Sequence, residues 1–271
     1  MATGMEAVIE LPLRKRTRGL LIETADRIPN SVRWLAGVTL RPWGCSGFVP
    51  SDANYCDYDA AELDDFFDVG TNPVFDAFDI YNTESCTTLD SDITVLNDRV
   101  EARWGVMVSE QVAARLNVEL AARAAVATTG PVNTSILVAK AEEQLALTLH
   151  GGVGMVHMSP AALSMVVAEG SVDLMEGQWR TPGGHTVVAD AGHTGVPPTG
   201  ETLLDGTEWV YTTGAVLYGL GEPRVPTKAT EYLDRDTNTN TARIIGTSVV
   251  AFDPCSASAI EYGFPDYTEG S

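Results

Sequence analysis

The chain has 271 residues, of which 37 are acidic and 17 basic, so its formal net charge at pH 7 is −20. Hydrophobic residues make up 44% of the chain and charged residues 20%, which is the composition of a folded globular protein rather than of a disordered one. The shortage of cations argues against a protein that reads DNA sequence, because binding to phosphates needs positive charge. No run of 18 uncharged apolar residues occurs, so no membrane-spanning helix is expected.

Charge is distributed unevenly along the sequence. Residues 51–100 hold thirteen acidic residues and one basic residue, Arg99, whereas residues 1–20 hold four basic residues and two acidic ones. No apolar segment precedes the basic cluster at residues 14–18, so we do not expect a secretory signal. A basic arm ahead of an acidic stretch indicates attraction or repulsion between chains rather than a catalytic pocket.

The sequence from residue 31 to residue 89 lacks helix signals. Prolines and glycines interrupt it, and it is rich in aromatic residues. Plain disorder lacks aromatics, and compact domains rarely contain so long an irregular run. We therefore predict extended arms and a loop whose aromatic side chains, including Phe66, Phe67, Phe75 and Phe78, are covered by neighbouring elements.

A long amphipathic helix is the strongest secondary-structure prediction. Apolar residues recur at every fourth position: Leu96, Val100, Trp104, Val108, Val112, Leu116 and Leu120. This spacing predicts a helix from about residue 91 to residue 127, with a length of about 50 Å. Residues 90–92 would cap its start and residues 128–131 would end it. A strict four-residue row drifts around a straight helix, so its packing partners should change along its length.

An α+β block and a closing hairpin follow the long helix. The sequence predicts a second helix that Asn133 or Thr134 caps and Gly151 stops, and a third helix that Ser159 caps and Gly170 ends. The expected β-type runs are 155–158, 179–181, 185–189, 209–213 and 215–218, with a hairpin of 228–233 and 242–252 around the polar turn 234–241.

No constellation of residues predicts a catalytic, cofactor-binding or metal site. The histidines form no H-E-x-x-H motif, so capping or surface roles are the better interpretation of His150, His157, His185 and His193. The cysteines form no C-x-x-C pair, so we expect buried free thiols at Cys45, Cys56, Cys86 and Cys255.

Three further motifs favour structural interpretations. The run from Asp234 resembles a calcium loop, but Thr239 and Ile245 stand where such a loop needs Gly and Glu, so a hairpin turn is preferred. The glycines of residues 151–154 follow a helix and precede a strand, which is the reverse of a dinucleotide-binding turn. Acidic pairs such as Glu142-Glu143 are typical of a solvated surface.

Several short runs occur in one order along the chain: Arg33-Trp-Leu-Ala-Gly37, Trp43-Gly-Cys45, Cys86 before the long helix, Gly154-Met-Val-His-Met-Ser-Pro160, Thr181-Pro-Gly-Gly184, Val187-Val-Ala-Asp190-Ala-Gly192, Tyr211-Thr-Thr-Gly214 and Val249-Val-Ala-Phe252-Asp-Pro254. With the order of arm, loop, long helix, α+β block and hairpin, they resemble the major capsid proteins of tailed phages, closest in look to those of actinobacterial (mycobacteriophage-type) phages. These proteins have the Hong Kong 97-like fold, which encapsulins share. The resemblance covers most of the chain after residue 30.

The resemblance implies an α+β subunit divided into five parts: an N-terminal arm (1–38), an extended loop that lies on a neighbouring subunit (39–88), the spine helix of a peripheral domain (89–130), an axial domain (131–225) and a return to the peripheral sheet (226–271). It implies a structural protein, not an enzyme, that needs no cofactor. The row residues Trp104 and Leu116 would then be buried against the peripheral sheet.

The implied function is a major capsid protein that self-assembles, as pentamers and hexamers, into an icosahedral shell enclosing the double-stranded DNA of a tailed bacteriophage. The implied partners are other copies of the chain, a portal at one vertex, decoration proteins, and packaged DNA bound without sequence specificity; no membrane is involved. Assembly would take place in the host cytoplasm and the product would be the virion. Since the arm begins almost at residue 1, a separate scaffolding protein, or none, is implied.

Two contacts of the loop follow from the resemblance. The family's covalent crosslink needs a lysine in the extended loop, and residues 39–88 contain none, so we expect a shell held without isopeptide bonds. The acidic residues of the loop would face solvent or the basic cluster of another subunit's arm, which consists of Arg14, Lys15, Arg16 and Arg18.

Three alternatives remain open at this point. An encapsulin-type nanocompartment would have the same fold and would carry enzyme cargo. A soluble α+β domain with a disordered acidic N-terminal third is the second alternative. The third is an unrecognised soluble α+β enzyme such as a hydrolase, which would need a catalytic dyad that the sequence does not display.

Overall fold

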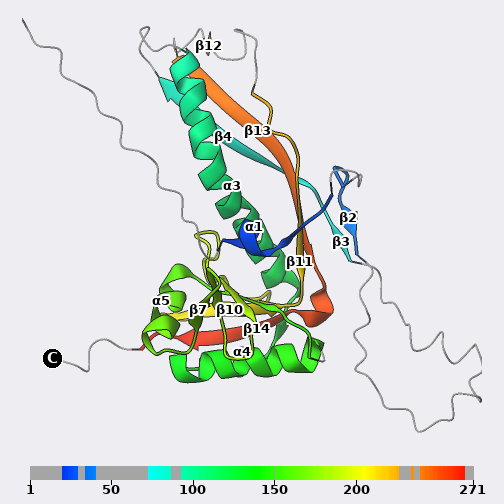
Figure 1. The fold of residues 1–271 in the computed structure, drawn as a ribbon, viewed down its shortest axis with the longest axis vertical. Helices are drawn as coiled ribbons and strands as arrows, with labels where there is room; N and C mark the ends of the chain where they lie inside the picture. Colours follow the sequence, from blue (N-terminus) through cyan, green and yellow to red (C-terminus); the bar gives the residue numbers. More distant parts are fainter. Residues whose placement is uncertain are drawn as a thin grey trace, which may run out of the picture.

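Two β-sheets are joined by one long helix in an elongated molecule (Figure 1). The computed structural model describes residues 20–29, 34–40, 73–86, 93–149, 151–225, 233–234 and 239–265. A short helix, α1 (Leu21–Thr24), precedes the first sheet strand. None of the described helices combines the length and the apolar character needed to cross a membrane.

Helix α3 (Ile93–Arg123) confirms the long helix that the four-residue spacing predicts. Six of the seven row residues are at most 3% exposed, and Trp104 is half-buried. The helix ends earlier than expected because Ala125–Val126 form strand β5, which pairs in parallel with Ser258–Ala259. The predicted capping residues 90–92 lie outside the described residues.

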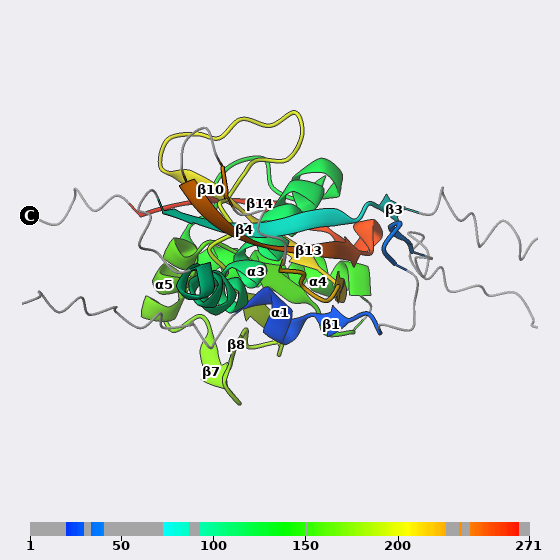
Figure 2. The same ribbon diagram turned by 90° about the horizontal axis from the view of Figure 1, so that it is seen from above.

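The five-stranded sheet lies along the first part of α3. Its path is β1 (Asp26–Arg27), β11 (Val216–Leu220), β13 (Thr239–Phe252) and β12 (Leu233–Asp234), with β4 (Phe78–Cys86) paired to β13. Seen along α3, β4 and β13 lie on one side of the helix and α1 on the other (Figure 2). The predicted closing hairpin is present in the described part of the chain, because Leu233 and Asp234 pair antiparallel with Asn240 and Thr239.

The seven-stranded sheet forms the core of the second part of the molecule. Its order is β5, β14 (Ser258–Gly263), β10 (Thr207–Thr213), β6 (Met155–His157), β9 (Thr186–Val188), β8 (Gln178–Arg180) and β7 (Asp173–Met175). One face packs on α4 (Thr134–Leu149) and α5 (Pro160–Ala168), as the shared core of Leu137, Leu145, Val166, Val210 and Ile260 shows. The other face packs on the second half of α3.

The packing partners of α3 therefore change along its length, as the drift of the apolar row predicts. Leu96 and Val100 belong to a small cluster with Ala242 and Ile244 of β13. From Val108 onward, the row joins a larger cluster that contains residues of both sheets. Trp104 contacts both clusters, and its indole covers Gly246 of β13 so closely that an added Cβ there would lie 2.8 Å from Trp104 Cζ2. A glycine inside this strand is explained by that close approach.

The caps predicted for the two shorter helices are present. Asn133 Oδ1 accepts a hydrogen bond from the Ile136 amide at 3.1 Å at the start of α4. Ser159 Oγ accepts one from the Ala162 amide at 3.1 Å at the start of α5, with Pro160 in the first turn. Both caps satisfy amides that have no partner within the helix.

Two strands differ from the expectations. The segment predicted as an extended loop contains β4, a nine-residue strand whose partners run from Phe78 opposite Ser248 to Cys86 opposite Asn240. The C-terminal part, predicted to return to the peripheral sheet, does so only through β12 and β13. Strand β14 instead joins the seven-stranded sheet, where it pairs antiparallel with β10. Long-range pairing decides both cases, since strands are stabilised by their neighbours.

Candidate functional site at the β2–β3 stem

A short two-stranded stem holds both ends of the segment between residues 40 and 73. Strand β2 (Val38–Thr39) pairs antiparallel with β3 (Val74–Phe75). The Leu40 amide donates to the Pro73 carbonyl at 3.1 Å. The chain therefore leaves and returns at one place at the side of the molecule (Figure 1), and residues 41–72 lie outside the described part.

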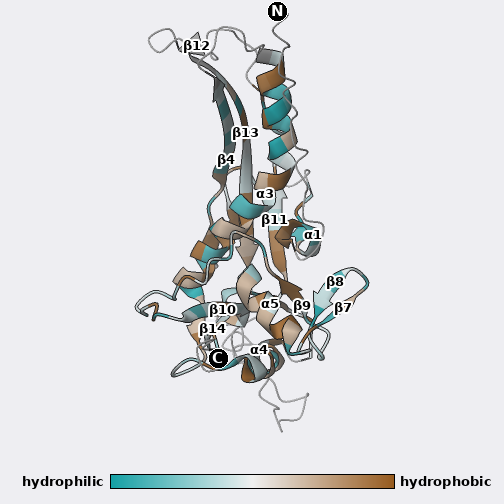
Figure 3. Ribbon diagram, turned by 90° about the vertical axis from the view of Figure 1, so that its left-hand side faces the viewer, coloured by the Kyte–Doolittle hydropathy of each residue, from teal (hydrophilic) through white to brown (hydrophobic). Residues whose placement is uncertain are grey.

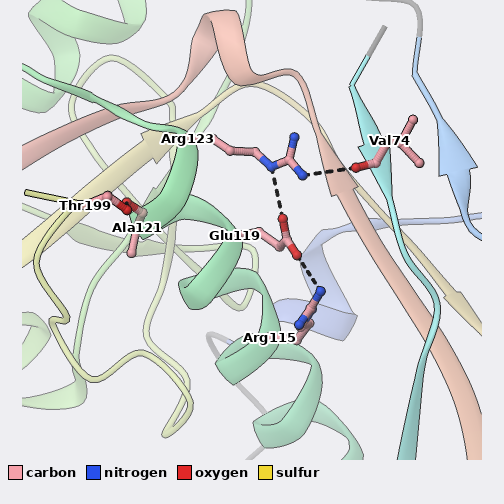
Figure 4. Close-up of polar contacts among 6 residues, drawn as sticks. All are labelled: Val74, Arg115, Glu119, Ala121, Arg123 and Thr199. Atoms are coloured by element: carbon pink, nitrogen blue, oxygen red, sulfur yellow. Dashed lines mark hydrogen bonds and ion pairs between the residues drawn. The ribbon is translucent and has the colours of Figure 1, made fainter.

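Arg123, at the end of α3, contacts the stem directly. Its Nη2 donates to the Val74 carbonyl at 3.0 Å, and its Nε donates to Glu119 Oε2 at 3.0 Å (Figure 4). The guanidinium carbon lies 4.5 Å from the centroid of the Phe75 ring. One side chain thus links helix, backbone and aromatic ring, which the planar fork of arginine permits and lysine does not.

Glu119 is shared between two arginines. Arg115 Nη2 lies 2.6 Å from Glu119 Oε1, and its guanidinium also lies over the Phe78 ring, 5.8 Å from the centroid. The side chain of Glu119 is 11% exposed, whereas those of Arg115 and Arg123 are 35% and 31% exposed. Four-residue spacing puts the three side chains on one face of α3. We name this set, Arg115, Glu119 and Arg123, the stem clamp.

The side chain of Phe75 fixes the stem to the hydrophobic core. It is 1% exposed and packs against Phe252 at the end of β13, with ring centroids 5.3 Å apart. The prediction that neighbouring elements cover this ring is therefore confirmed for Phe75, and the covering element, β13, belongs to its own chain. Phe66 and Phe67 lie outside the described residues, and Phe78 is half-buried.

A second loop meets α3 next to the clamp. The Thr199 amide donates to the Ala121 carbonyl at 2.7 Å, and the Thr199 hydroxyl donates to the same oxygen at 3.2 Å. Figure 4 shows this contact beside the clamp. The last turn of α3 is therefore the place where the stem, the end of β13 and a loop of the second sheet meet.

The structure separates the histidines weighed in the sequence. His157 and His193 are both buried with ring centroids 5.2 Å apart, so the surface or capping interpretation is wrong for them. His185 is buried and its Nδ1 accepts a hydrogen bond from the Gly154 amide at 3.1 Å. His150 lies outside the described residues. Among the described residues, no three His, Cys, Asp or Glu side chains are placed to hold a metal ion.

Cys255 also departs from expectation. It lies in the short 3-10 helix η2 (Pro254–Ser256) and is disulfide-bonded, so it is not a free thiol. The side chains of Cys45, Cys56 and Cys86 lie outside the described part of the chain. Of the acidic pair considered on α4, Glu143 forms an ion pair with Lys140 at 2.6 Å and Glu142 accepts a hydrogen bond from the Gly183 amide.

Removing the guanidinium of Arg123 tests the clamp. For Arg123→Gln we expect a loss of about 1 kcal/mol or less in the free energy of unfolding, because the ion pair is partly exposed. The stem, however, loses its hydrogen bond to α3, so we expect the amides of residues 38–40 and 74–75 to exchange with solvent several-fold faster. Lys140→Gln is the matched control, since it removes an ion pair of α4 that touches no part of the stem. Chemical denaturation and hydrogen–deuterium exchange measure the two effects; equal exchange of the stem amides in both variants would contradict the role of the clamp.

Comparison with known proteins reveals the fold but no close relative. No protein-family model matches the chain, and no curated protein matches it significantly. The capsid of Ralstonia phage GP4 is similar with a TM-score of 0.56 and 10% identity, over 98% of this chain and 96% of that chain. The SrpI encapsulin of Synechococcus elongatus PCC 7942 is similar with a TM-score of 0.52 and 10% identity, over 98% and 95%. A chain of Gordonia phage Cozz is similar with a TM-score of 0.52 and 13% identity, over 97% and 92%. The chain therefore has the α+β, Hong Kong 97-like fold, which spans nearly its full length.

Proposed function

We propose that this chain is the repeating subunit of an icosahedral protein shell, and specifically the major capsid protein of a tailed bacteriophage. One observation carries the proposal: the fold corresponds to the Ralstonia phage GP4 capsid over 98% of this chain and 96% of that chain. The role is structural rather than catalytic.

The exposed apolar residues support assembly with further copies. Leu174 and Met175, at 41% and 54% exposure, lie on the β7–β8 hairpin, which projects from the body of the molecule (Figure 3). Ile136 and Leu147, at 45% and 65% exposure, lie on the outer side of α4. These residues are available for contacts with further copies of the chain.

The proposed division of the subunit follows the two sheets. The peripheral domain would consist of the first half of α3 with β4, β11, β12 and β13. The axial domain would consist of the seven-stranded sheet with α4 and α5, and it would include β14. Of the arm (1–38) and the extended loop (39–88), the parts before α1 and between β2 and β3 would reach neighbouring subunits, whereas α1, β1 and β4 pack on their own chain. The stem clamp would set the direction in which the loop leaves.

The proposed partners are further copies of the chain, packaged DNA, a portal and accessory proteins. Pentamers and hexamers of the chain would enclose double-stranded DNA, which a net charge of −20 would leave free to move, since a basic interior would bind phosphate. A portal at one vertex and scaffolding or decoration proteins would complete the particle in the host cytoplasm. The sequence runs quoted above and the similarity to Gordonia phage Cozz favour a phage of the actinobacterial type.

Electron microscopy of the purified protein tests the proposal. We expect closed icosahedral particles, with a sedimentation coefficient far above that of a 28.9 kDa monomer. The experiment is run alone and with any scaffolding protein supplied. A monomer at high concentration under both conditions would contradict the shell function.

An encapsulin-type compartment is the second candidate, because the SrpI encapsulin matches the chain over the same length. The two functions differ in content. Particles from the native host that hold packaged DNA and a portal would establish the capsid, whereas a co-purified enzyme inside particles without a portal would establish the encapsulin.

The shell should be held together without isopeptide bonds. Residues 39–88 contain no lysine, so the loop lacks the amine that the crosslink of related capsids requires. Particles boiled in denaturant and run with reductant should give a single band near 28.9 kDa. A ladder of multiples that survives reduction would overturn this expectation.

A further inference from the structure

A buried histidine pair lies between the seven-stranded sheet and the rest of the molecule. His157 on β6 and His193, in the loop after β9, are 1% and 2% exposed, and their ring centroids are 5.2 Å apart. His157 Nε2 is 2.8 Å from the Thr213 hydroxyl. Within the described part of the chain, His157 Nδ1 and both ring nitrogens of His193 have no hydrogen-bond partner. Both rings therefore lie in the core as neutral imidazoles, which pack much as apolar side chains do.

The turn of residues 190–193, which carries His193, connects strand β9 with helices α1 and α3. The His193 amide donates to the Asp190 carbonyl at 3.0 Å and closes the turn. The buried Asp190 carboxylate accepts hydrogen bonds from the Ser109 hydroxyl of α3 and, at 3.4 Å, from the Leu21 amide of α1. Gly192 lies against the backbone of α3 at Glu110 and Ala114. We name residues 190–193 and the side chains of His157 and Ser109 the joint.

Few charges face the pair. Asp190 supplies a buried carboxylate from the joint itself, and β10 supplies Tyr211, whose hydroxyl donates to the Val196 carbonyl. On the facing helices, the nearby acids Glu110 of α3 and Glu23 of α1 are exposed. Glu208 of β10 is engaged with the Ser159 hydroxyl at the start of α5. An imidazolium in the joint would thus have one buried carboxylate as counter-charge, and the two hydrogen bonds that this carboxylate accepts from Leu21 and Ser109 both end on Oδ2.

Burial sets the proton affinity of both rings. Desolvation lowers the pKa of His193 to about 4, and Asp190 opposes this shift only in part. Desolvation, followed by repulsion from His193, holds the pKa of His157 well below its usual range. An unfolded histidine has a pKa near 6.5, so the unfolded chain binds more protons between that pH and about pH 4. The stability that depends on neutral rings is complete above pH 6.5 and is lost as pH falls toward 4.

We propose that the His157–His193 pair makes the joint acid-labile, so that acidification detaches α1 and the 190–193 turn from α3 before the α4–α5 side of the seven-stranded sheet opens. Two like charges at this separation in an apolar environment repel each other, and the hydrogen bonds of Asp190 to Leu21 and Ser109 lie directly beside them. The inference concerns the single subunit and stands whether or not the chain forms a shell.

Thermal unfolding of the unassembled subunit from pH 7.5 to pH 4.5 tests the proposal. We expect the wild-type Tm to fall by roughly 5–10 °C more than that of His193→Met, which cannot be protonated and loses no hydrogen bond. Leu145→Met is the control, since it changes a buried side chain of α4 outside the joint and removes no titratable group, and its Tm should follow the wild-type pH profile. Equal pH profiles for wild type and His193→Met would overturn the proposal.

Hydrogen–deuterium exchange of the wild-type subunit provides a test that needs no variant. After correction for the intrinsic pH dependence of exchange, we expect residues 21–28 and 190–193 to lose protection by at least ten-fold between pH 7 and pH 5, while residues 137–145 of α4 stay protected. Uniform loss across these segments, or unchanged protection in all of them, would refute an acid-labile joint.

Discussion

Gly192→Ala should displace the 190–193 turn from α3, with a loss of unfolding free energy at or above the upper end of the ~1–3 kcal/mol that overpacking costs. An added Cβ at this position would collide with the Glu110 carbonyl oxygen and the Ala114 amide nitrogen, which are backbone atoms of α3. Backbone cannot move aside as a flexible side chain can, so the whole 190–193 turn must shift. We expect a large drop in Tm and a high fraction of insoluble protein.

Gly105→Ala on the same helix is the matched control. Nothing lies within 4 Å of a Cβ built at Gly105, which is exposed in the middle of α3. Alanine has the higher helix propensity there, so this variant should gain about 0.5–1 kcal/mol. Chemical denaturation compares the two variants; similar stabilities would show that the turn does not pack on α3 as described.

Leu116→Ala should cost about 2–5 kcal/mol of unfolding free energy. Leu116 has no exposed surface and belongs to the cluster that includes Val249 and Phe252 of β13. Truncation leaves a cavity where α3 meets the five-stranded sheet, so we expect little assembled protein. Val118→Ala is the control, since Val118 is 55% exposed two residues further along the helix. Its effect should stay within about 0.5 kcal/mol.

The Leu116 and Gly192 variants test two different contacts of α3. Leu116 tests the apolar row, which was visible in the sequence, and Gly192 tests the contact with a loop 80 residues away, which was not. A small loss in Leu116→Ala with normal assembly would show that the row does not support the core. The Leu116 result does not depend on the proposed shell, because unfolding is measured on the free subunit.

Local sequence patterns were sufficient to predict the helices. The four-residue row of α3 predicts a buried stripe, and Asn133 and Ser159 predict the starts of α4 and α5, because caps and periodicity act within a few residues of the chain. The clamp was also visible in part: Arg115, Glu119 and Arg123 stand four residues apart. That spacing predicts ion pairs along the helix, yet it does not reveal that Arg123 also binds the Val74 carbonyl.

The sequence of β4 contains a strand pattern that the prediction of an extended loop overlooks. Phe78, Ile80 and Asn82 alternate with the exposed residues Asp79, Tyr81 and Thr83, which is the two-residue period of a half-buried strand. The many acids and breaks around it obscured the pattern. Pairing with β13, more than 150 residues away, is what makes this segment a strand rather than an arm.

The sequence by itself determined the long helix α3, the shorter helices α4 and α5, the strong acidity and the absence of lysine from residues 39–88, since each depends on neighbouring residues or on composition alone. Only the tertiary structure decided that β14 belongs to the second sheet, that Phe75 is covered by Phe252, and that His157 meets His193. These contacts join residues that are 36 to 177 positions apart. Burial and pairing at such distances come from the packing of whole elements, and no local pattern records them.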